Sequence, residues 1–222
     1  MAINILGINH KATPIEVREK LVFNKKSVTQ ALNDIKNIKG VNGVVLLSTC
    51  NRTEIYTENE DDNSRVLNWL NNQNSQEDIS SYIYNHSDEN AIKHLFNVAS
   101  GIDSMVIGEN EILGQVKQAF KVADTEKTIN PTLKRLFEYS FYVAKQVRTD
   151  TDIGSNPVSF MFTAMSLIKK IFADLESKNA TVLGSGHMSQ LALKYLQSHN
   201  IKNIRLTNHN TEKGKNLALE HG

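Results

Sequence analysis

Residues 44–56 read VVLLSTCNRTEIY, an apolar run that ends in polar residues around the only cysteine of the chain. The run Val44–Leu47 predicts a buried strand, and Thr53–Thr57 predicts a second strand that leaves at once. Cys50 is therefore expected at a strand end, two residues before Arg52. The thiolate is the reactive form of cysteine, and a nearby guanidinium lowers the pKa of the thiol. This arrangement is typical of a nucleophile; the alternative is a half-buried free cysteine in a hairpin.

The composition limits the size of the fold and the kinds of partner. The chain has 222 residues, 40% of them hydrophobic, which is enough for one large domain or two modest ones. Its 25 basic and 24 acidic residues give a net charge of +1, so any contact with RNA must come from a local patch.

The same sequence predicts a compartment. A single cysteine excludes an internal disulfide and suits a reducing cytosol. Residues 1–7 do not place a basic region before a long apolar run, so we expect no signal peptide. No stretch is apolar for the roughly 18 residues of a membrane span. We therefore expect a cytoplasmic protein without a membrane segment.

The N-terminal part predicts the order strand, helix, strand, strand, helix, strand. This order is the split βαβ (ferredoxin-like) plan of an α+β domain, with an antiparallel sheet and helices on one face. The strands are expected at residues 3–8, 44–47, 53–57 and 82–84, and the helices at residues 27–38, capped by Ser27, and around residues 66–70.

A helical stretch with a glycine-rich segment follows. Asp88 is expected to cap one helix, residues 100–115 are punctuated by glycines, and Pro131 is expected to start a further helix. On that last helix Lys134, Lys145 and Arg148 share a face. The face could meet a phosphate backbone, and the alternative is an ordinary solvated helix face.

The C-terminal part predicts the opening of a Rossmann-like NADP-binding domain. A polar stretch before Pro157 predicts domains at residues 1–150 and 151–222, so the chain as a whole is α/β. Strands are expected at residues 180–183 and 204–207, with a GxGxxS turn between the first of them and a helix. The turn would place a pyrophosphate on the helix N-terminus; the alternative is a tight turn without a cofactor.

The end of the second predicted strand bears on the cofactor. Residues 208–210 read NHN, without the carboxylate that holds the ribose of NAD, so a 2′-phosphate near His209 is favoured. The chain stops one helix later, whereas a dinucleotide fold needs further strands. We therefore expect the N-terminal part of a longer protein, or a domain that folds only partially.

Several blocks, in order along nearly the whole chain, resemble glutamyl-tRNA reductase. The family continues with the rest of its NADPH domain and a long helical dimerisation domain. The matching blocks are residues 7–14 with Arg18 and Glu19, 47–56, 100–109, 112–117, 145–151 and the glycine turn.

The resemblance implies a two-step chemistry. Cys50 would attack the ester that joins glutamate to the tRNA 3′ end, giving a thioester and releasing tRNA. Hydride from NADPH would then give glutamate-1-semialdehyde, the first committed step toward tetrapyrroles (porphyrins and heme). Covalent catalysis of this kind divides a hard reduction into two easier steps.

The resemblance also assigns residues. His94 would be the second catalytic residue, protonating the departing ribose oxygen or the hemithioacetal; its place on the helix alone indicates a boundary histidine. The implied ligands of the glutamyl group are Thr49, Asn51, Arg52, Ser104, Glu109, Asn110, Glu111 and Gln115. The implied contacts of NADPH are Gly184, Ser185, Gly186, His187, Met188 and Ser189.

Further implications concern partners and departures. The family is a homodimer through a region beyond Gly222, and handover of the product to glutamate-1-semialdehyde aminomutase is implied. The chain departs from the family at four positions. Asn110 and Glu111 stand where Pro and Gln are usual, Ser189 stands where Gly is usual, and His209 stands where Arg is usual.

Two other functions stay open. A thiol-dependent NAD(P) aldehyde dehydrogenase would need a complete dinucleotide domain and an acid after the second strand, and it would accept free aldehydes. A non-catalytic tRNA-binding module would keep its function in a Cys50→Ala variant. A pure binding module has no need of a lone thiol beside a guanidinium.

Overall fold

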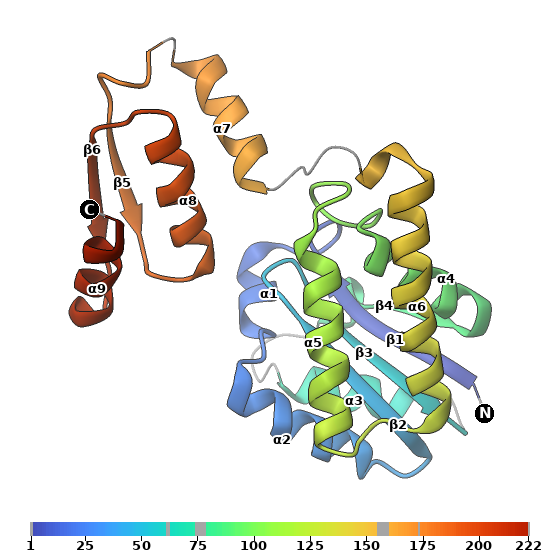
Figure 1. Cartoon of the computed structure of the whole chain (residues 1–222). Coiled ribbons are helices and arrows are strands. Elements are labelled where there is room, and N and C mark those ends of the chain that lie inside the picture. Colours follow the sequence, from blue (N-terminus) through green and yellow to red (C-terminus); the bar gives the residue numbers. More distant parts are fainter. Residues whose placement is uncertain (1, 61–62, 74–78, 155–159, 173, 222) are drawn as a thin grey trace. The chain divides into compact units, whose positions relative to one another are not determined.

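The computed structural model describes residues 2–60, 63–73, 79–154, 160–172 and 174–221 (Figure 1). The chain forms two compact units, Met1–Pro157 and Val158–Gly222, and each is described by itself. The polar stretch that predicted a boundary after residue 150 runs into residues 155–159, which lie outside the described ranges.

The first unit is built on a four-stranded antiparallel sheet with the order β2-β3-β1-β4. This order confirms the ferredoxin-like plan, because β1 lies between β3 and β4 and the two strands of the hairpin sit together at one side. The strands are β1 (Ala2–Asn9), β2 (Val41–Ser48), β3 (Arg52–Asn59) and β4 (Tyr84–Ser87).

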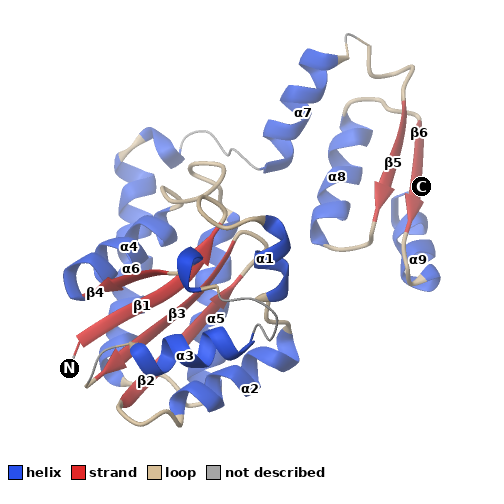
Figure 2. Ribbon diagram, turned by 180° about the vertical axis from the view of Figure 1, so that it is seen from behind, coloured by secondary structure: helices blue, strands red, loops and turns tan. Residues whose placement is uncertain are grey.

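Helices cover both faces of this sheet rather than one. Figure 2 shows α2 and α3 in front of the sheet, and Figure 1, from the opposite side, shows α5 and α6 in front of it. All eight residues of β3 are buried, as expected for a strand covered on both sides. The helices of this unit are α1 (Ile15–Lys20), α2 (Lys25–Lys36), α3 (Ser64–Gln73), α4 (Asp88–Ser100), α5 (Glu111–Thr125) and α6 (Pro131–Asp150).

The sheet and α6 share one apolar core. Tyr56 of β3 and Phe137 of α6 are both 0% exposed, and their rings meet edge to face with centroids 5.2 Å apart. Pro131 is the first residue of α6, and Asn130 caps the helix by accepting a hydrogen bond from the Leu133 amide at 3.0 Å. The helix predicted to begin at Pro131 is therefore confirmed.

Three expected boundaries are wrong by a few residues. α2 is capped by Asn24, whose side chain accepts from the amides of Lys26 and Ser27, rather than by Ser27. The fourth strand follows a 3-10 turn and starts at Tyr84. Asp88 is the first residue of α4 rather than its cap, which is Ser87, and its carboxylate accepts from the Ile3 amide of β1.

The second unit contains the predicted βαβ unit. Strand β5 pairs in parallel with β6, and α8 connects them. In the described part of the chain, no helix combines the length and the apolarity that crossing a membrane requires. The elements of this unit are α7 (Phe160–Ile171), β5 (Asn179–Leu183), α8 (His187–Ser198), β6 (Asn203–Thr207) and α9 (Thr211–His221).

Candidate active site

Cys50 lies in the tight turn between β2 and β3, and its side chain is exposed. Thr49 closes this turn: its hydroxyl accepts from the amides of Asn51 and Arg52, both at 3.1 Å. The Thr49 amide in turn donates to the carbonyl of Arg52 at 2.8 Å. The predicted strand-end position is confirmed, and residue 50 lies at the surface.

The arginine that acts on the thiol is Arg18 and not Arg52. Its Nη1 donates to the carbonyl of Cys50 at 2.8 Å. Neighbouring atoms partly desolvate the sulfur of this exposed residue, which raises the pKa of the Cys50 thiol. The charges of Glu109 and Glu111 raise it further, whereas a backbone hydrogen bond and the charge of Arg18 lower it. The net pKa is raised, so the expectation of a thiol activated by Arg52 is wrong for this structure.

Replacing Glu111 with glutamine is expected to speed alkylation of Cys50 by iodoacetamide by about threefold near neutral pH. Removing one anion lowers the pKa of the thiol, so more thiolate is present at any pH below that pKa. Mass spectrometry of the alkylated chain across a pH series measures the shift. Glu138→Gln, at an exposed position of α6, should leave the rate unchanged, and a slower Glu111→Gln variant would contradict the assigned charge effect.

Arg52 instead belongs to a buried ionic network. Its side chain is 2% exposed, and Nη1 donates to Glu54 Oε1 at 2.6 Å. Nη2 donates to the carbonyl and to Oδ2 of Asp103, at 2.5 and 2.9 Å. The ammonium of Lys11 pairs with the other carboxylate oxygen of Asp103. The guanidinium is thus held between two carboxylates.

Glu54 is the centre of this network. Its side chain is 0% exposed, Oε1 accepts from the hydroxyl of Tyr84 at 2.5 Å, and Oε2 accepts from the hydroxyl of Tyr56. His94 Nε2 lies 2.8 Å from Glu54 Oε1. Burial by itself would raise the pKa of Glu54, but the charge of Arg52 and the contact with His94 lower it far below its usual range. The carboxylate is therefore ionised.

The sheet register explains why the network fits here. Successive side chains of a strand point to opposite faces, so those of residues 52, 54 and 56 lie on the same face of β3. Gly7 of β1 lies directly opposite Glu54. A Cβ on Gly7 would come within 2.8 Å of the Tyr84 hydroxyl and 2.9 Å of Glu54 Cγ. Glycine at this position therefore makes room for the two side chains.

The site residues predicted from the sequence did not include Glu54, Tyr84 or Asp103. The available signal was the i, i+2 spacing of Arg52 and Glu54 on a strand that also carries Ile55 and Tyr56. A carboxylate and a guanidinium on one buried face of a strand must find partners.

The glycine-rich segment after α4 forms a loop that is fixed at its ends. Gly101 and Gly108 have φ angles of +79° and +83°, which residues with a side chain rarely adopt. Arg148 of α6 donates to the carbonyl of Glu109 at 2.6 Å and to the side chain of Asn110. Arg148 thus faces this loop, and Lys134 pairs with Asp124 at 3.0 Å, so the predicted basic face of α6 is largely engaged.

The remaining predicted ligands of the glutamyl group lie on this loop or on α5. Ser104 is 7% exposed, and its hydroxyl is among the groups that lower the pKa of Glu109, which burial raises. Gln115 is exposed, one helical turn after Glu111 on α5. Thr49, Cys50 and Asn51 share the hairpin turn, whereas His94 and Arg52 meet at Glu54. Contact of these residues with a glutamyl group stays a prediction.

The glycine turn of the second unit has the geometry expected for a phosphate-binding turn. Gly184 has φ of +100°, and Gly186 occupies the N-cap position of α8 with open space where a Cβ would be. The hydroxyl of Ser189 lies 3.5 Å from the carbonyl of Leu183, so it faces the turn. A hollow next to the turn is lined by Ser185, Gln190, Lys213, Asn216, Leu217 and Glu220.

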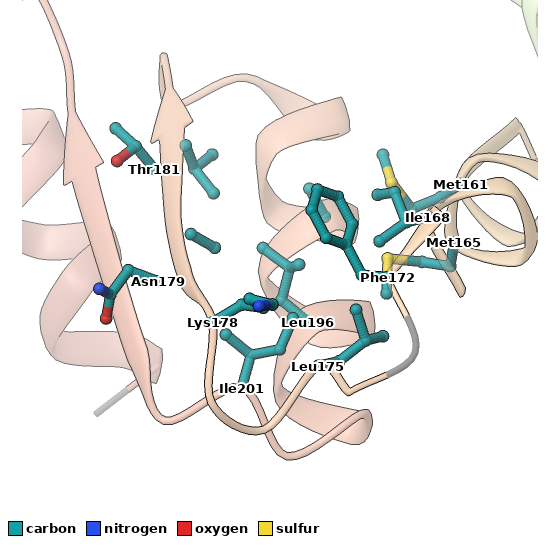
Figure 3. A pocket seen from close by; sticks show the side chains of 13 residues that line it. Met161, Met165, Ile168, Phe172, Leu175, Lys178, Asn179, Thr181, Leu196 and Ile201 are labelled. Atoms are coloured by element: carbon teal, nitrogen blue, oxygen red, sulfur yellow. The ribbon is translucent and has the colours of Figure 1, made fainter. Parts of the chain in front are cut away.

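A separate cavity of about 460 Å³ lies between α7, β5 and α8 (Figure 3). Met161, Met165, Ile168 and Phe172 of the α7 region form one side of it. Its walls are mainly apolar, and none of the six predicted cofactor residues lines it. This cavity is therefore chemically unsuited to a charged pyrophosphate.

Comparison with known proteins assigns both units. Residues 6–151 match the family model described as glutamyl-tRNAGlu reductase, N-terminal domain. Residues 166–222 match the one described as shikimate / quinate 5-dehydrogenase. The solved structure of glutamyl-tRNA reductase from Methanopyrus kandleri superimposes with a TM-score of 0.67 at 32% identity, covering 99% of this chain and 52% of that one.

Curated relatives match over the full chain. Glutamyl-tRNA reductase of Xylella fastidiosa (strain M12) is 41% identical over 222 residues, and the match covers 100% of this chain and 51% of that protein. Glutamyl-tRNA reductase of Pseudomonas savastanoi pv. phaseolicola is 42% identical over 225 residues, and the match covers 100% of this chain and 53% of that protein. The chain thus spans about half the length of the curated relatives it matches. The chain belongs to the glutamyl-tRNA reductase family.

Proposed function

We propose that this chain carries the acyl-transfer part of an NADPH-dependent glutamyl-tRNA reductase, an enzyme of the first step of tetrapyrrole synthesis. The observation that supports this best is the exposed thiol of Cys50 in a turn fixed by Thr49, within a domain of this family. The residues of the turn match the family block quoted above.

The proposed step is a transesterification onto sulfur. The Cys50 thiolate attacks the ester carbonyl of glutamyl-tRNA, so a C–S bond forms and the C–O bond to the ribose breaks. The ribose oxygen leaves with a proton, for which His94 is the proposed donor. Because the pKa of the thiol is raised, acylation should become faster as the pH increases.

The proposed ligands of the glutamyl group are Thr49, Asn51, Arg52, Ser104, Glu109, Asn110, Glu111 and Gln115. Arg52 is suited to a carboxylate because its guanidinium can donate two parallel hydrogen bonds. Its Nη2 already accommodates a carboxylate, that of Asp103, which is shared with Lys11. We propose that the substrate carboxylate takes the place of Asp103 on Arg52.

The second unit is proposed to hold NADPH. The turn at Gly184 and Gly186 before α8 supports a bound pyrophosphate, contacted by Ser185, His187, Met188 and Ser189. Residues 208–210 offer no carboxylate to a ribose, which favours a 2′-phosphate. When bound, NADPH would supply the hydride that reduces the thioester. The homodimer and the handover to glutamate-1-semialdehyde aminomutase stay predictions from the resemblance.

The test is to incubate the chain with tRNA charged with radiolabelled glutamate. We expect label on the protein, a matching mass increase on the peptide that contains Cys50, and release of the label by hydroxylamine, which cleaves thioesters. Protein alkylated beforehand at its single cysteine serves as the control and should stay unlabelled. Absence of label on the untreated protein, or label that resists hydroxylamine, would refute the proposal.

A further inference from the structure

One oxygen of Glu54 connects two ionisable residues that the proposed chemistry uses, Arg52 and His94. Oε1 receives Nη1 of Arg52 at 2.6 Å and lies 2.8 Å from Nε2 of His94. The two partners come from different elements: Arg52 begins β3, and His94 is on α4, 40 positions after Glu54. Glu54 therefore fixes the position of the histidine relative to the guanidinium.

The protonation of the carboxylate decides the protonation of the ring. An ionised carboxylate can only accept hydrogen bonds, and the charge of Arg52 keeps the pKa of Glu54 far below its usual range although burial opposes this. Nε2 of His94 must then carry the proton in the contact with Oε1. In the neutral ring, Nδ1 is the nitrogen left as the acceptor.

The carboxylate itself is held rigidly. Burial, followed by the charge of Glu54, raises the pKa of the Tyr56 and Tyr84 hydroxyls well above the ordinary value, so both stay donors to Glu54. Tyr56 packs edge to face against Phe137, and Glu54 and Tyr84 lie close against the backbone of Gly7 on β1. Rings of Tyr84 and His86 also lie 5.3 and 5.0 Å from the ring of His94.

We propose that Glu54 is a positioning residue that holds Arg52 and the Nε2–H of His94 on one buried oxygen, so that His94 acts on the substrate through Nδ1. The role as a proton donor rests on the proposed function: it needs the doubly protonated ring, which gives its Nδ1 proton to the ribose oxygen and keeps Nε2–H on Glu54. The position of the proton in the neutral ring does not rest on that function. A carboxylate that orients a histidine and stabilises its protonated form is a general arrangement in acid–base catalysis.

The ring proton is tested first, by heteronuclear NMR of the histidine nitrogens in mildly alkaline buffer on the wild-type chain. We expect His94 to carry its proton on Nε2, with a downfield, slowly exchanging N–H resonance, and Nδ1 to be unprotonated. In Glu54→Gln this resonance should move upfield and exchange faster. His199 of the second unit is the internal reference and should not change. A wild-type His94 protonated on Nδ1 would overturn the proposal.

The rate of glutamate transfer to Cys50 is tested second. Glu54→Gln is expected to slow labelling by about 100-fold, the lower range for a lost acid–base group. The matched control is Glu58→Gln, a second buried carboxylate on the same face of β3, which accepts from Asn130 and touches neither Arg52 nor His94 in the described structure. It should stay within about twofold of wild type.

A second variant separates the charge of Glu54 from the packing around it. Tyr84→Phe removes one donor and keeps the carboxylate, so it should lose less than about fivefold. Equal losses in Tyr84→Phe and Glu54→Gln, or an unaffected Glu54→Gln, would overturn the role of the charge. If the wild type takes up no label at all, the proposed function fails, while the NMR result still decides the position of the proton.

Discussion

Replacing Cys50 with serine is expected to reduce the transfer of glutamate from tRNA to the protein by at least about a thousandfold. A serine hydroxyl is a weak nucleophile unless a base removes its proton, and the side chains that hydrogen-bond across the turn, Arg18 and Asn51, are not bases. The measurement is the initial rate of labelling with charged tRNA, compared at equal protein concentration.

The same variant should keep the stability of wild type within about 0.5 kcal/mol, because the side chain at position 50 is exposed. Unfolding of the two proteins in denaturant provides this control. Equal labelling of wild type and Cys50→Ser would show that another residue accepts the glutamate. Absence of label on both proteins, together with full function in Cys50→Ala, would favour a tRNA-binding module.

Replacing Arg52 with methionine is expected to lower the free energy of unfolding by about 3–5 kcal/mol at neutral pH, the usual cost of leaving a buried charge without its partner. Glu54 would then keep His94 and two hydroxyls but lose its permanent cation. Urea unfolding followed by the fluorescence of Trp69, the only tryptophan and part of the first unit, measures the change.

The loss in Arg52→Met should depend on pH in a fixed direction. In wild type the pKa of Glu54 is lowered, so its contribution is present above the unfolded pKa of about 4.3 and is lost as the pH falls through the lower folded value. In the variant, burial raises the pKa, so stability falls as the pH increases. The difference between the two proteins should therefore widen from acid to neutral pH.

Two further proteins make this result specific. The double variant Arg52→Met with Glu54→Gln removes both charges and should be more stable than Arg52→Met by about 1–2 kcal/mol. Arg65→Met removes an arginine that is exposed and donates to the carbonyl of Lys39, and it should change stability by less than about 0.5 kcal/mol. A double variant no better than Arg52→Met would contradict the buried-charge explanation.

Much of the fold was predictable because its signals are local. The apolar run Val44–Leu47 and the polar turn after it predicted a strand end at Cys50, and β2 ends at Ser48. The caps of α2 and α4 and the first residue of β4 differ from the predicted positions by a few residues. Asn24 and Ser27 are both good caps, and only packing of α2 on the sheet selects between them.

The candidate site was predictable in its residues more than in its charges. Proximity in sequence suggested that Arg52 acts on Cys50. Cys50 lies in the exposed turn, however, whereas Arg52 is the first residue of β3 and its side chain points into the core toward Glu54. Arg18, 32 residues before Cys50, approaches the turn instead. Arg148 likewise looked like part of a solvated face and in fact holds the carbonyl of Glu109.

The sequence by itself determined the succession of helices and strands, the strand end with its lone thiol and the glycine turn before α8, because each follows from local periodicity and from residues with special backbone preferences. Only the tertiary structure decided which ionisable groups pair. Arg52, Glu54, His94 and Asp103 meet through sheet register and helix packing across 51 positions of the chain. The energy of buried charges depends on their partners and their burial, and neither quantity is encoded in the neighbours along the chain.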